Sequence, residues 1–195
     1  MDCNLSIQEV RPTLKTATII TSSGFVQPVS DSLTEDVQDH ISTGDIIYSI
    51  MDRDKTIGFA VFDVLPGSIL LLSGIMLEAN YQAQGITQAI IGQAREETKT
   101  KFLSLRTQSL RMWRVGAKVC AGWYPSNGDG IPDVIQERGE IVAERLKADF
   151  PVSFGFYDGP LYGEKPVYRD EELQTWWDNL CSFEGGDAVI CVGQF

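Results

Sequence analysis

Tyr81-Gln82-Ala83-Gln84-Gly85-Ile86-Thr87-Gln88 is a polar stretch between an apolar run, Ser68 to Leu77, and a segment with helical periodicity that ends near Lys101. This order predicts a strand that passes through a short loop into a helix. The first backbone N–H groups of such a helix have no intrahelical acceptor and lie at its positive end. Gly85 has no Cβ to keep a bulky group away from the backbone. The stretch therefore predicts an anion site, with a pyrophosphate as the expected guest.

Side chains of the same stretch add hydrogen-bond donors around that site. The residues expected to bind the guest here are Gln82, Ala83, Gln84, Gly85, Ile86, Thr87 and Gln88. The alternative is that Gly85 is an ordinary glycine at a helix entry, and the motif alone leaves that alternative open.

The spacing Gln82-x-x-Gly85-x-Thr87 resembles the Gln/Arg-x-x-Gly-x-Gly/Ala signature of the GNAT superfamily of N-acetyltransferases, which binds acetyl-CoA. The resemblance is best from about Thr56 to Tyr124. One position departs from the signature, because Thr87 stands where the family prefers Gly or Ala. Its side chain crowds the loop slightly and supplies a hydroxyl donor.

The resemblance implies an α/β (α+β) fold with a mixed, mostly antiparallel central sheet, flanking helices and a V-shaped splay between the fourth and fifth strands. Ile75–Tyr81 looks like the fourth strand, and Phe102–Thr107 would be the fifth. Gly74 is either the bulge that the family has in the fourth strand or a plain weak spot. We expect a single domain, 1–195, with an insertion at about 158–186 that covers the acceptor side.

The resemblance also implies a cofactor and its contacts. Acetyl-CoA would be the donor and CoA the product. Backbone N–H groups near Met76 and Leu77 would donate to the acyl oxygen, and Ser109 stands where the family commonly has an Asn that contacts the cofactor arm. Glu78 is the acidic side chain in the strand that reaches the loop, so it is the candidate base. A plain surface carboxylate is the alternative for Glu78.

The acid that protonates the leaving thiolate is harder to assign. The family commonly has a Tyr four residues before a Gly-Phe pair. If Gly122-Trp123 is that pair, Lys118 occupies the Tyr position. Tyr124 is the candidate substitute, and a structural Tyr at the start of a strand is its alternative.

Composition indicates a globular protein of 195 residues with 43% hydrophobic residues. The longest aliphatic run, Ile69–Leu72, is far below the roughly 18 apolar residues that cross a bilayer. Met1–Asn4 lacks the basic start and apolar stretch of a signal peptide, so we expect a cytoplasmic protein. Four cysteines without Cys-x-x-Cys spacing and a single His indicate neither a metal site nor a disulfide framework.

Charge is concentrated in the second half of the chain. Residues 126–187 have 14 acidic and 5 basic residues, a net of −9, whereas residues 1–125 have 13 and 11, a net of −2. Such a surface repels nucleic acid and anionic membrane, so we expect neither as a partner. It would attract a cationic amine, although a solvated surface that serves solubility is the alternative. A homodimer is a further open alternative.

Local patterns predict the remaining elements. Predicted strands are Thr16–Ser22, Ile46–Met51, Thr56–Leu65, Phe150–Tyr157 and Asp187–Phe195, and predicted helices are Ser32–Ile41, Ser109–Cys120, Ile131–Asp149 and Glu171–Phe183. Asp31 or Ser32 would cap the first of these helices, with Glu35 closing a capping box.

Two functions fit these observations. The first is an acetyl-CoA-dependent N-acetyltransferase that moves an acetyl group directly to a primary amine of a small molecule, peptide or protein. The second is a catalytically weak or inactive acetyl-CoA-binding module with a regulatory or structural role. The missing Tyr favours the second function, and the loop argues against a protein that binds no ligand.

Overall fold

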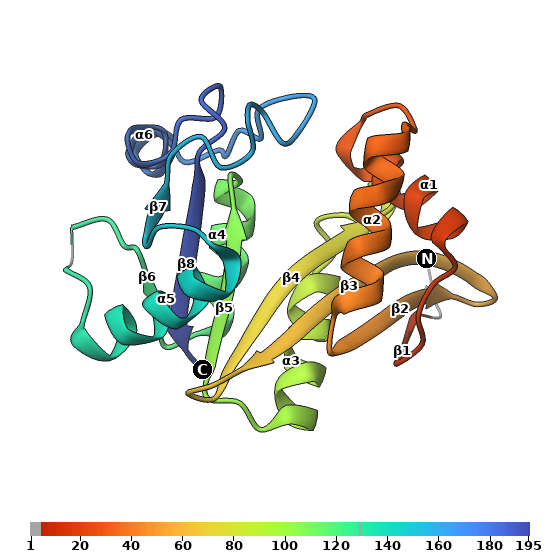
Figure 1. Ribbon diagram of the computed structural model, residues 1–195, viewed down its shortest axis with the longest axis horizontal. Helices are drawn as coiled ribbons and strands as arrows, with labels where there is room; N and C mark the ends of the chain where they lie inside the picture. Colours follow the sequence, from red (N-terminus) through yellow and green to blue (C-terminus); the bar gives the residue numbers. More distant parts are fainter. Residues whose placement is uncertain (1–4, 129) are drawn as a thin grey trace. The chain divides into compact units, whose positions relative to one another are not determined.

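The computed structural model describes residues 5–128 and 130–195 (Figure 1). Met1–Asn4, the segment behind the expected cytoplasmic location, lies outside the described residues. The chain divides into two compact units. The N-terminal unit contains the described residues up to Asp63 and also Leu72–Ala94, and the C-terminal unit contains Val64–Leu71 and Arg95–Phe195. The expectation of one domain with an insertion over 158–186 stays a prediction.

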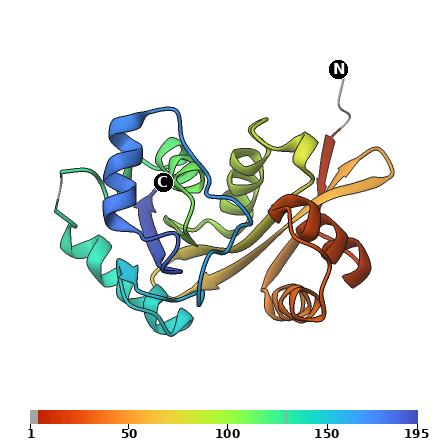
Figure 2. The ribbon, with the colours of Figure 1, turned by 90° about the horizontal axis from the view of Figure 1, so that it is seen from above.

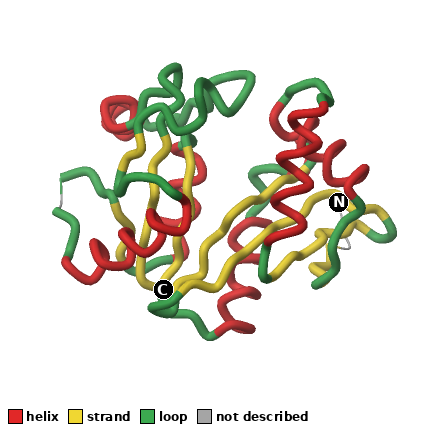
Figure 3. The backbone as a smooth tube through the Cα atoms, in the orientation of Figure 1, coloured by secondary structure: helices red, strands yellow, loops and turns green. Residues whose placement is uncertain are grey.

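After two consecutive helices and three consecutive strands in the N-terminal part, helices and strands alternate along the chain (Figure 3). The strands are β1 (Leu5–Gln8), β2 (Ile46–Asp52), β3 (Lys55–Leu65), β4 (Ile69–Leu77), β5 (Phe102–Thr107), β6 (Gly122–Tyr124), β7 (Val152–Ser153) and β8 (Ala188–Gln194). The helices are α1 (Leu14–Phe25), α2 (Asp31–Thr43), α3 (Ile86–Thr98), α4 (Leu110–Val119), α5 (Asp133–Leu146) and α6 (Glu171–Leu180), with a 3-10 turn, η1 (Ala79–Tyr81).

The strand order is β1-β2-β3-β4-β5-β8-β6, and β7 pairs with β8. The sheet is mostly antiparallel, with a parallel β4–β5 pair. The expected fold class, a mixed sheet with flanking helices, is therefore confirmed. The splay between β4 and β5 and the bulge at Gly74 stay predictions.

β2 and β3 form a hairpin, as two apolar runs on either side of the polar segment Asp52–Lys55 predict, but the turn is shorter than the four residues of that segment. Asp52 pairs with Lys55, so the turn contains only two residues, and Arg53 adopts a left-handed φ of 55°. Two-residue hairpin turns require this conformation because it follows the twist of the strands. β1, which no local sequence pattern indicates, pairs antiparallel with the other edge of β2.

The prediction of a strand at Thr16–Ser22 is wrong, because this segment lies inside α1. Its Thr and Ile residues favour strands. The side chain of Thr13 nevertheless caps a helix here, since its hydroxyl accepts a hydrogen bond from the Thr16 N–H at 3.2 Å. The buried side chains recur at helical spacing, at Ala17, Ile20 and Thr21. Helical burial therefore outweighs strand propensity.

The cap predicted for α2 is also wrong. Ser30, one residue before the predicted candidates, accepts from the Leu33 N–H at 3.1 Å. This shift moves Glu35 away from the capping-box position. α1 and α2 cover an apolar cluster of the N-terminal unit, which consists of Ala17, Ile20, Val37, Ile41, Ile47, Phe59 and Val61.

β8 is the central strand of the C-terminal unit and pairs antiparallel with β5, β6 and β7. Its residues from Ala188 to Val192 are fully buried. α4 and α5 lie on opposite faces of this strand (Figure 2). The apolar cluster on the α5 face contains Leu65, Ile69, Leu71, Phe102, Ile135, Val142, Ala143, Ile190 and Val192.

The strand predicted over Phe150–Tyr157 is mostly wrong, since only Val152–Ser153 is extended and paired. Gly155 and Asp158 have positive φ values of 62° and 54°, so the chain turns instead of continuing along β8. α5 is shorter than predicted because Pro132 takes the N-cap position and Lys147 adopts a left-handed conformation at the other end. α6 likewise ends at Leu180, before the predicted Phe183. Within the described ranges, no helix combines the length and apolarity needed to span a bilayer.

Candidate functional site

The predicted anion loop lies in the N-terminal unit, where β4 ends and α3 begins. β4 is held at its end by a hydrogen bond from the Glu78 N–H to the Ile57 carbonyl at 2.9 Å. η1 follows, and the Tyr81 hydroxyl donates to Asp52 at 2.7 Å. These bonds fix the loop at its strand end. The predicted order of strand, polar loop and helix is confirmed, and α3 starts at Ile86. The extension of the strand to Tyr81 is wrong, because β4 ends at Leu77 and Ala79–Tyr81 forms η1.

The loop itself is exposed from Gln82 to Gly85. The Gln side chains are predicted to donate to the guest, but two of them donate to nearby backbone carbonyls. Gln82 donates through Nε2 to the Leu77 carbonyl at 3.1 Å, and Gln84 donates to the Asn80 carbonyl at 2.7 Å. Both side chains therefore fix the shape of the loop, whatever else they contact.

Gly85 is the residue that gives the loop its opening. Its φ is +80°, a conformation that favours glycine, and Ala83 is also left-handed at +60°. A Cβ added at Gly85 would find Gln88 Oε1, at 3.9 Å, as its nearest heavy atom. A ligand group can occupy the open space that such a Cβ would fill. The N–H groups of the first turn, including those of Ile86 and Thr87, have no intrahelical acceptor.

Glu78, the candidate base, sits between β4 and η1. Its Oε2 accepts an ion-pair hydrogen bond from Lys55 Nζ at 2.7 Å, and the Glu78 side chain is 21% exposed. Within residues 5–128 and 130–195, Oε1 has no hydrogen-bond partner. One carboxylate oxygen is thus anchored while the other is available to take a proton.

The strand before Glu78 changes its exposure along its length. Residues 69–72 of β4 are buried, whereas Ser73 to Met76 are half-buried. Leu77 is buried again, and its carbonyl receives the Gln82 side chain. Met76 and Leu77, the expected acyl-oxygen donors, therefore lie at the end of β4, before Glu78 and η1, and in the same unit as the loop.

Ser109 precedes α4 in the C-terminal unit and is 4% exposed. Ser109 occupies the N-cap position of α4, but its side chain makes no cap hydrogen bond. Its N–H instead donates to the Thr107 hydroxyl at 2.8 Å. Thr107 also hydrogen-bonds Tyr162, whose pKa is raised mainly by burial, so its hydroxyl stays protonated. Tyr162 was missed because it lies in an irregular segment without any sequence motif.

Tyr124, the candidate acid, lies on β6 and packs against the apolar cluster on the α5 face. The preceding Trp123 contacts α4 on the other face, since a Cβ at Gly116 would lie 2.0 Å from its ring. Neighbouring strand residues point to opposite faces. The structure therefore does not bring Tyr124 to the helix that Ser109 begins. Lys118, at the expected Tyr position, is exposed at the end of α4.

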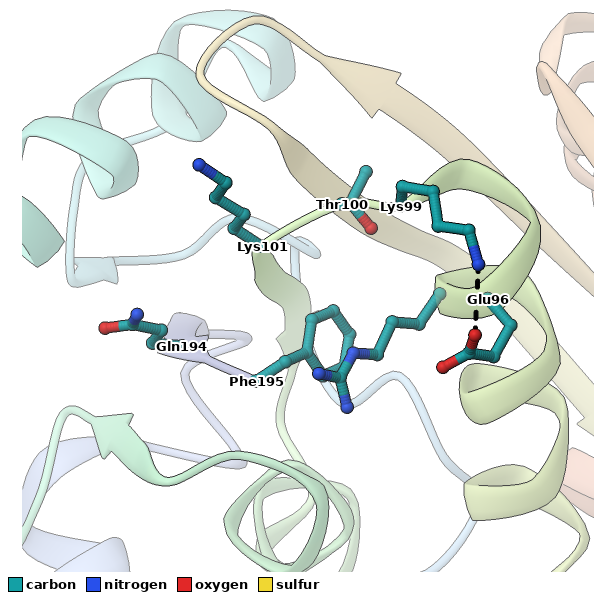
Figure 4. Close-up of a pocket in the computed structure, with 7 residues that line it drawn as sticks. Glu96, Lys99, Thr100, Lys101, Gln194 and Phe195 are labelled. Atoms are coloured by element: carbon teal, nitrogen blue, oxygen red, sulfur yellow. Dashed lines mark hydrogen bonds and ion pairs between the residues drawn. The ribbon is translucent and has the colours of Figure 1, made fainter.

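A pocket of about 280 Å³ also lies in the C-terminal unit (Figure 4). Its lining consists of Arg95, Glu96, Lys99, Thr100, Lys101, Gln194 and Phe195. Lys99 pairs with Glu96 at 3.1 Å, and this contact lowers the pKa of the Glu96 carboxyl. All its charged side chains are exposed. No predicted site residue lines this pocket, and water screens its charges, so it receives no functional assignment.

Comparisons with known proteins show which solved structures share this fold. No protein-family model matches the chain, and no curated protein matches it. Among similar solved structures, the ribosomal-protein-S18-alanine N-acetyltransferase of Escherichia coli has a TM-score of 0.58 and 14% identity, covering 97% of this chain and 93% of that chain. The IAA acetyltransferase of Bacillus cereus has a TM-score of 0.56 and 13% identity, covering 98% and 100%.

A GNAT family acetyltransferase from Elizabethkingia anophelis, whose structure has acetyl-CoA bound, has a TM-score of 0.54 and 14% identity, covering 98% of this chain and 99% of that chain. At such identities the likeness concerns the fold. The chain has the fold of the GNAT acetyltransferases, as the resemblance at Gln82–Thr87 implied.

Proposed function

We propose that the protein is an N-acetyltransferase that uses acetyl-CoA and transfers its acetyl group directly to a primary amine. The observation that carries this proposal is the exposed loop before α3, where Gly85 at a φ of +80° leaves open space in front of the first-turn amides. An oxygen-rich anion such as a pyrophosphate suits that space. The fold shared with acetyltransferases supports the same assignment.

The residues of the chain then take separate roles. The loop from Gln82 to Gln88 holds the diphosphate, and the half-buried part of β4 accommodates the cofactor arm, with Ser109 as a further contact. When bound, acetyl-CoA supplies the thioester. The N–H groups of Met76 and Leu77 orient its carbonyl oxygen, and Glu78 takes the proton that the incoming ammonium must lose.

The protonation state of the thiols favours direct transfer over a route in which a cysteine first takes the acetyl group. Burial raises the pKa of Cys120 and Cys181 to about 12 and that of Cys191 well above its usual range. A thiol nucleophile must be a thiolate. The cysteines in the described part of the chain therefore stay protonated and unreactive at neutral pH.

The acidic second half supports a cationic acceptor for this reaction. With a net charge of −9 over residues 126–187, the capture of a cationic amine should weaken as salt shortens the Debye length to about 8 Å or less. The comparison is the KM for a cationic and a neutral amine across a salt series. If salt changes the KM of the two amines equally, the acidic half of the chain serves solubility and does not recognise the acceptor. We place the reaction in the cytoplasm.

A second candidate, an acetyl-CoA-binding module without turnover, is favoured by one observation. Tyr124 packs against the α5-face cluster and Lys118 replaces the usual Tyr, which leaves the leaving-group acid unassigned. Calorimetry with acetyl-CoA and free-thiol release across a panel of amines separate the two functions. Binding with amine-dependent thiol release supports the enzyme, binding without release supports the module, and no binding overturns both.

A further inference from the structure

His40 on α2 is the single histidine of the chain, and a hydrogen bond fixes the orientation of its ring. Its Nδ1 lies 2.8 Å from the Asp36 carbonyl, one turn earlier in the helix, and 3.6 Å from the carboxylate of the same residue. A carbonyl oxygen only accepts, so Nδ1 carries the hydrogen and the neutral ring has its lone pair on Nε2. Nε2 is therefore the nitrogen that can take a proton.

The other edge of the ring faces β4. A Cβ added at Gly74 would lie 3.4 Å from His40 Cδ2, the only heavy atom of the described residues that it would meet within 4 Å, apart from those of its chain neighbours. Nε2 is bonded to Cδ2 and lies on the same edge of the ring. In the described part of the chain Nε2 has no hydrogen-bond partner, and it is not enclosed. Nε2 is thus accessible beside an open stretch of the strand.

The face of β4 that α2 covers also contains part of the proposed site. Met76 packs against the apolar cluster that includes Ile41, the neighbour of His40 on α2. Gly74 and Met76 are two residues apart, which is roughly 7 Å along a strand. α2, this part of β4 and Glu78 all belong to the N-terminal unit. A ligand that extends along β4 from Gly74 to Met76 would therefore pass His40.

The proposed transfer needs a residue that handles a second proton. An ammonium nitrogen that becomes an amide loses two protons, and Glu78 takes the first. The second leaves as the nitrogen bonds to the acyl carbon, and the sulfur gains one proton as the C–S bond breaks. Tyr124 packs against the α5-face cluster, so the residue that moves this proton is still to be assigned.

We propose that His40 is the catalytic residue for this second proton, which its Nε2 takes from the amine nitrogen and gives to the sulfur of CoA. The proposal rests on the proposed function and deepens it. There the half-buried part of β4 accommodates the cofactor arm, and the N–H groups of Met76 and Leu77 orient the carbonyl. A thioester held in this way would have its sulfur beside Ser73–Met76, the stretch that His40 faces. Histidine suits the role because it both takes and gives a proton near neutral pH.

The charged groups around His40 are compatible with a ring that gains and loses a proton. On α2, Asp36 lies 3.6 Å from Nδ1, and the adjacent Asp39 is exposed. β4 has no ionisable side chain from Ile69 to Leu77, and Asp63 on β3 accepts a hydrogen bond from a serine of β4. Asp36 can therefore pair with the ring while the ring carries the proton.

The first test uses the single histidine. Nitrogen NMR of protein labelled at its histidine reports on His40 alone. The free protein should show the tautomer with the hydrogen on Nδ1. Saturation with CoA should shift the Nε2 signal, and desulfo-CoA, which lacks the sulfur, should shift it clearly less, with calorimetry showing that both ligands are bound. An Nε2 signal that CoA leaves in place, or that both ligands shift equally, overturns the inference.

The second test concerns the chemistry. His40→Gln should keep its fold by circular dichroism and its affinity for CoA, and should lower kcat roughly 10²-fold or more. The dependence of kcat on pH near neutrality should also change, because a titrating group is removed. Asp39→Asn is the matched control, because it removes a charge from the exposed next residue of α2, and it should keep the wild-type rate. A His40→Gln rate within about threefold of wild type at every pH overturns the inference.

These outcomes separate the inference from the proposed function. If amines release thiol from acetyl-CoA but the Nε2 signal ignores the sulfur, or His40→Gln keeps its rate, the inference is overturned and the acetyltransferase stands. If CoA binds and no amine releases thiol, the proposed function fails, and the role of His40 in the transfer fails with it.

Discussion

Replacing Gly85 by Asp tests the central element of the site. The added Cβ has only Gln88 Oε1 near it, at 3.9 Å, so the protein without ligand has room for the side chain. The φ of +80° adds strain of about 1 kcal/mol, and Asp tolerates this region better than most residues. The variant should therefore fold, with a modest loss of stability, and its carboxylate should occupy the space assigned to the diphosphate.

The expected loss of affinity follows from the charges. Two unit charges about 5 Å apart repel by about 3 kcal/mol at an effective dielectric constant of about 20. That energy corresponds to roughly 10²-fold weaker binding of CoA. Gly85→Ala adds the Cβ and the strain without the charge, so its loss should be smaller, about 10-fold or less.

Calorimetric titration with CoA at about 0.15 M salt measures these losses. Gly92→Asp is the matched control, because Gly92 lies on the exposed side of the same helix and a Cβ there meets nothing within 4 Å. That control should bind CoA as the wild type does. Undiminished binding by Gly85→Asp, with the fold intact by circular dichroism, would show that the loop does not bind CoA.

Four further predictions test other parts of the chain. Glu78→Gln should keep CoA binding and lower kcat roughly 10²-fold, and a rate within about threefold of wild type moves the base elsewhere. Tyr124→Phe should lower kcat if Tyr124 is the acid that protonates the leaving thiolate. If the dependence of kcat on pH is unchanged, Tyr124 is a packing residue. Gly116→Ala should destabilise the fold by about 2 kcal/mol or more in urea melts, because its Cβ would lie 2.0 Å from Trp123. The free energy of unfolding should fall between about pH 9 and 12, by about 1.4 kcal/mol per pH unit for each thiol whose pKa is raised, because the thiol of the unfolded chain loses its proton first. In Cys181→Ala the fall with pH should be less steep, and an unchanged slope would refute the prediction.

The sequence predicts an element best where its structure depends on residues that are close together along the chain. The loop at Gln82–Gln88, the β2–β3 hairpin and β5 all follow from short patterns of apolar, turn and glycine residues, and all three are found where expected. The error at Thr16–Ser22 has the same local origin, since β-branched residues suggested a strand and only burial against α2 and the sheet decides for a helix.

Contacts between distant segments were beyond such patterns. Arg106 and Tyr157 are 51 positions apart, and nothing near either residue in the sequence indicates that they meet. Tyr162 reaches Thr107 from an irregular segment for which periodicity gives no signal. Tyr124 was a reasonable candidate by position, but the face of β6 on which it lies depends on where α4 and α5 pack, and one sequence does not determine that.

The loop also changes how its own motif should be understood. Gln82 and Gln84 look like ligand-binding residues because their side chains carry donors, yet the structure uses those donors on the Leu77 and Asn80 carbonyls. The anion would then be held mainly by backbone N–H groups, whose positions the Gln side chains preserve. Backbone donors do not depend on the identity of the side chain. This explains how Thr87 can stand where the family has Gly or Ala, because that position needs an N–H group at the start of α3 and a side chain that does not block it.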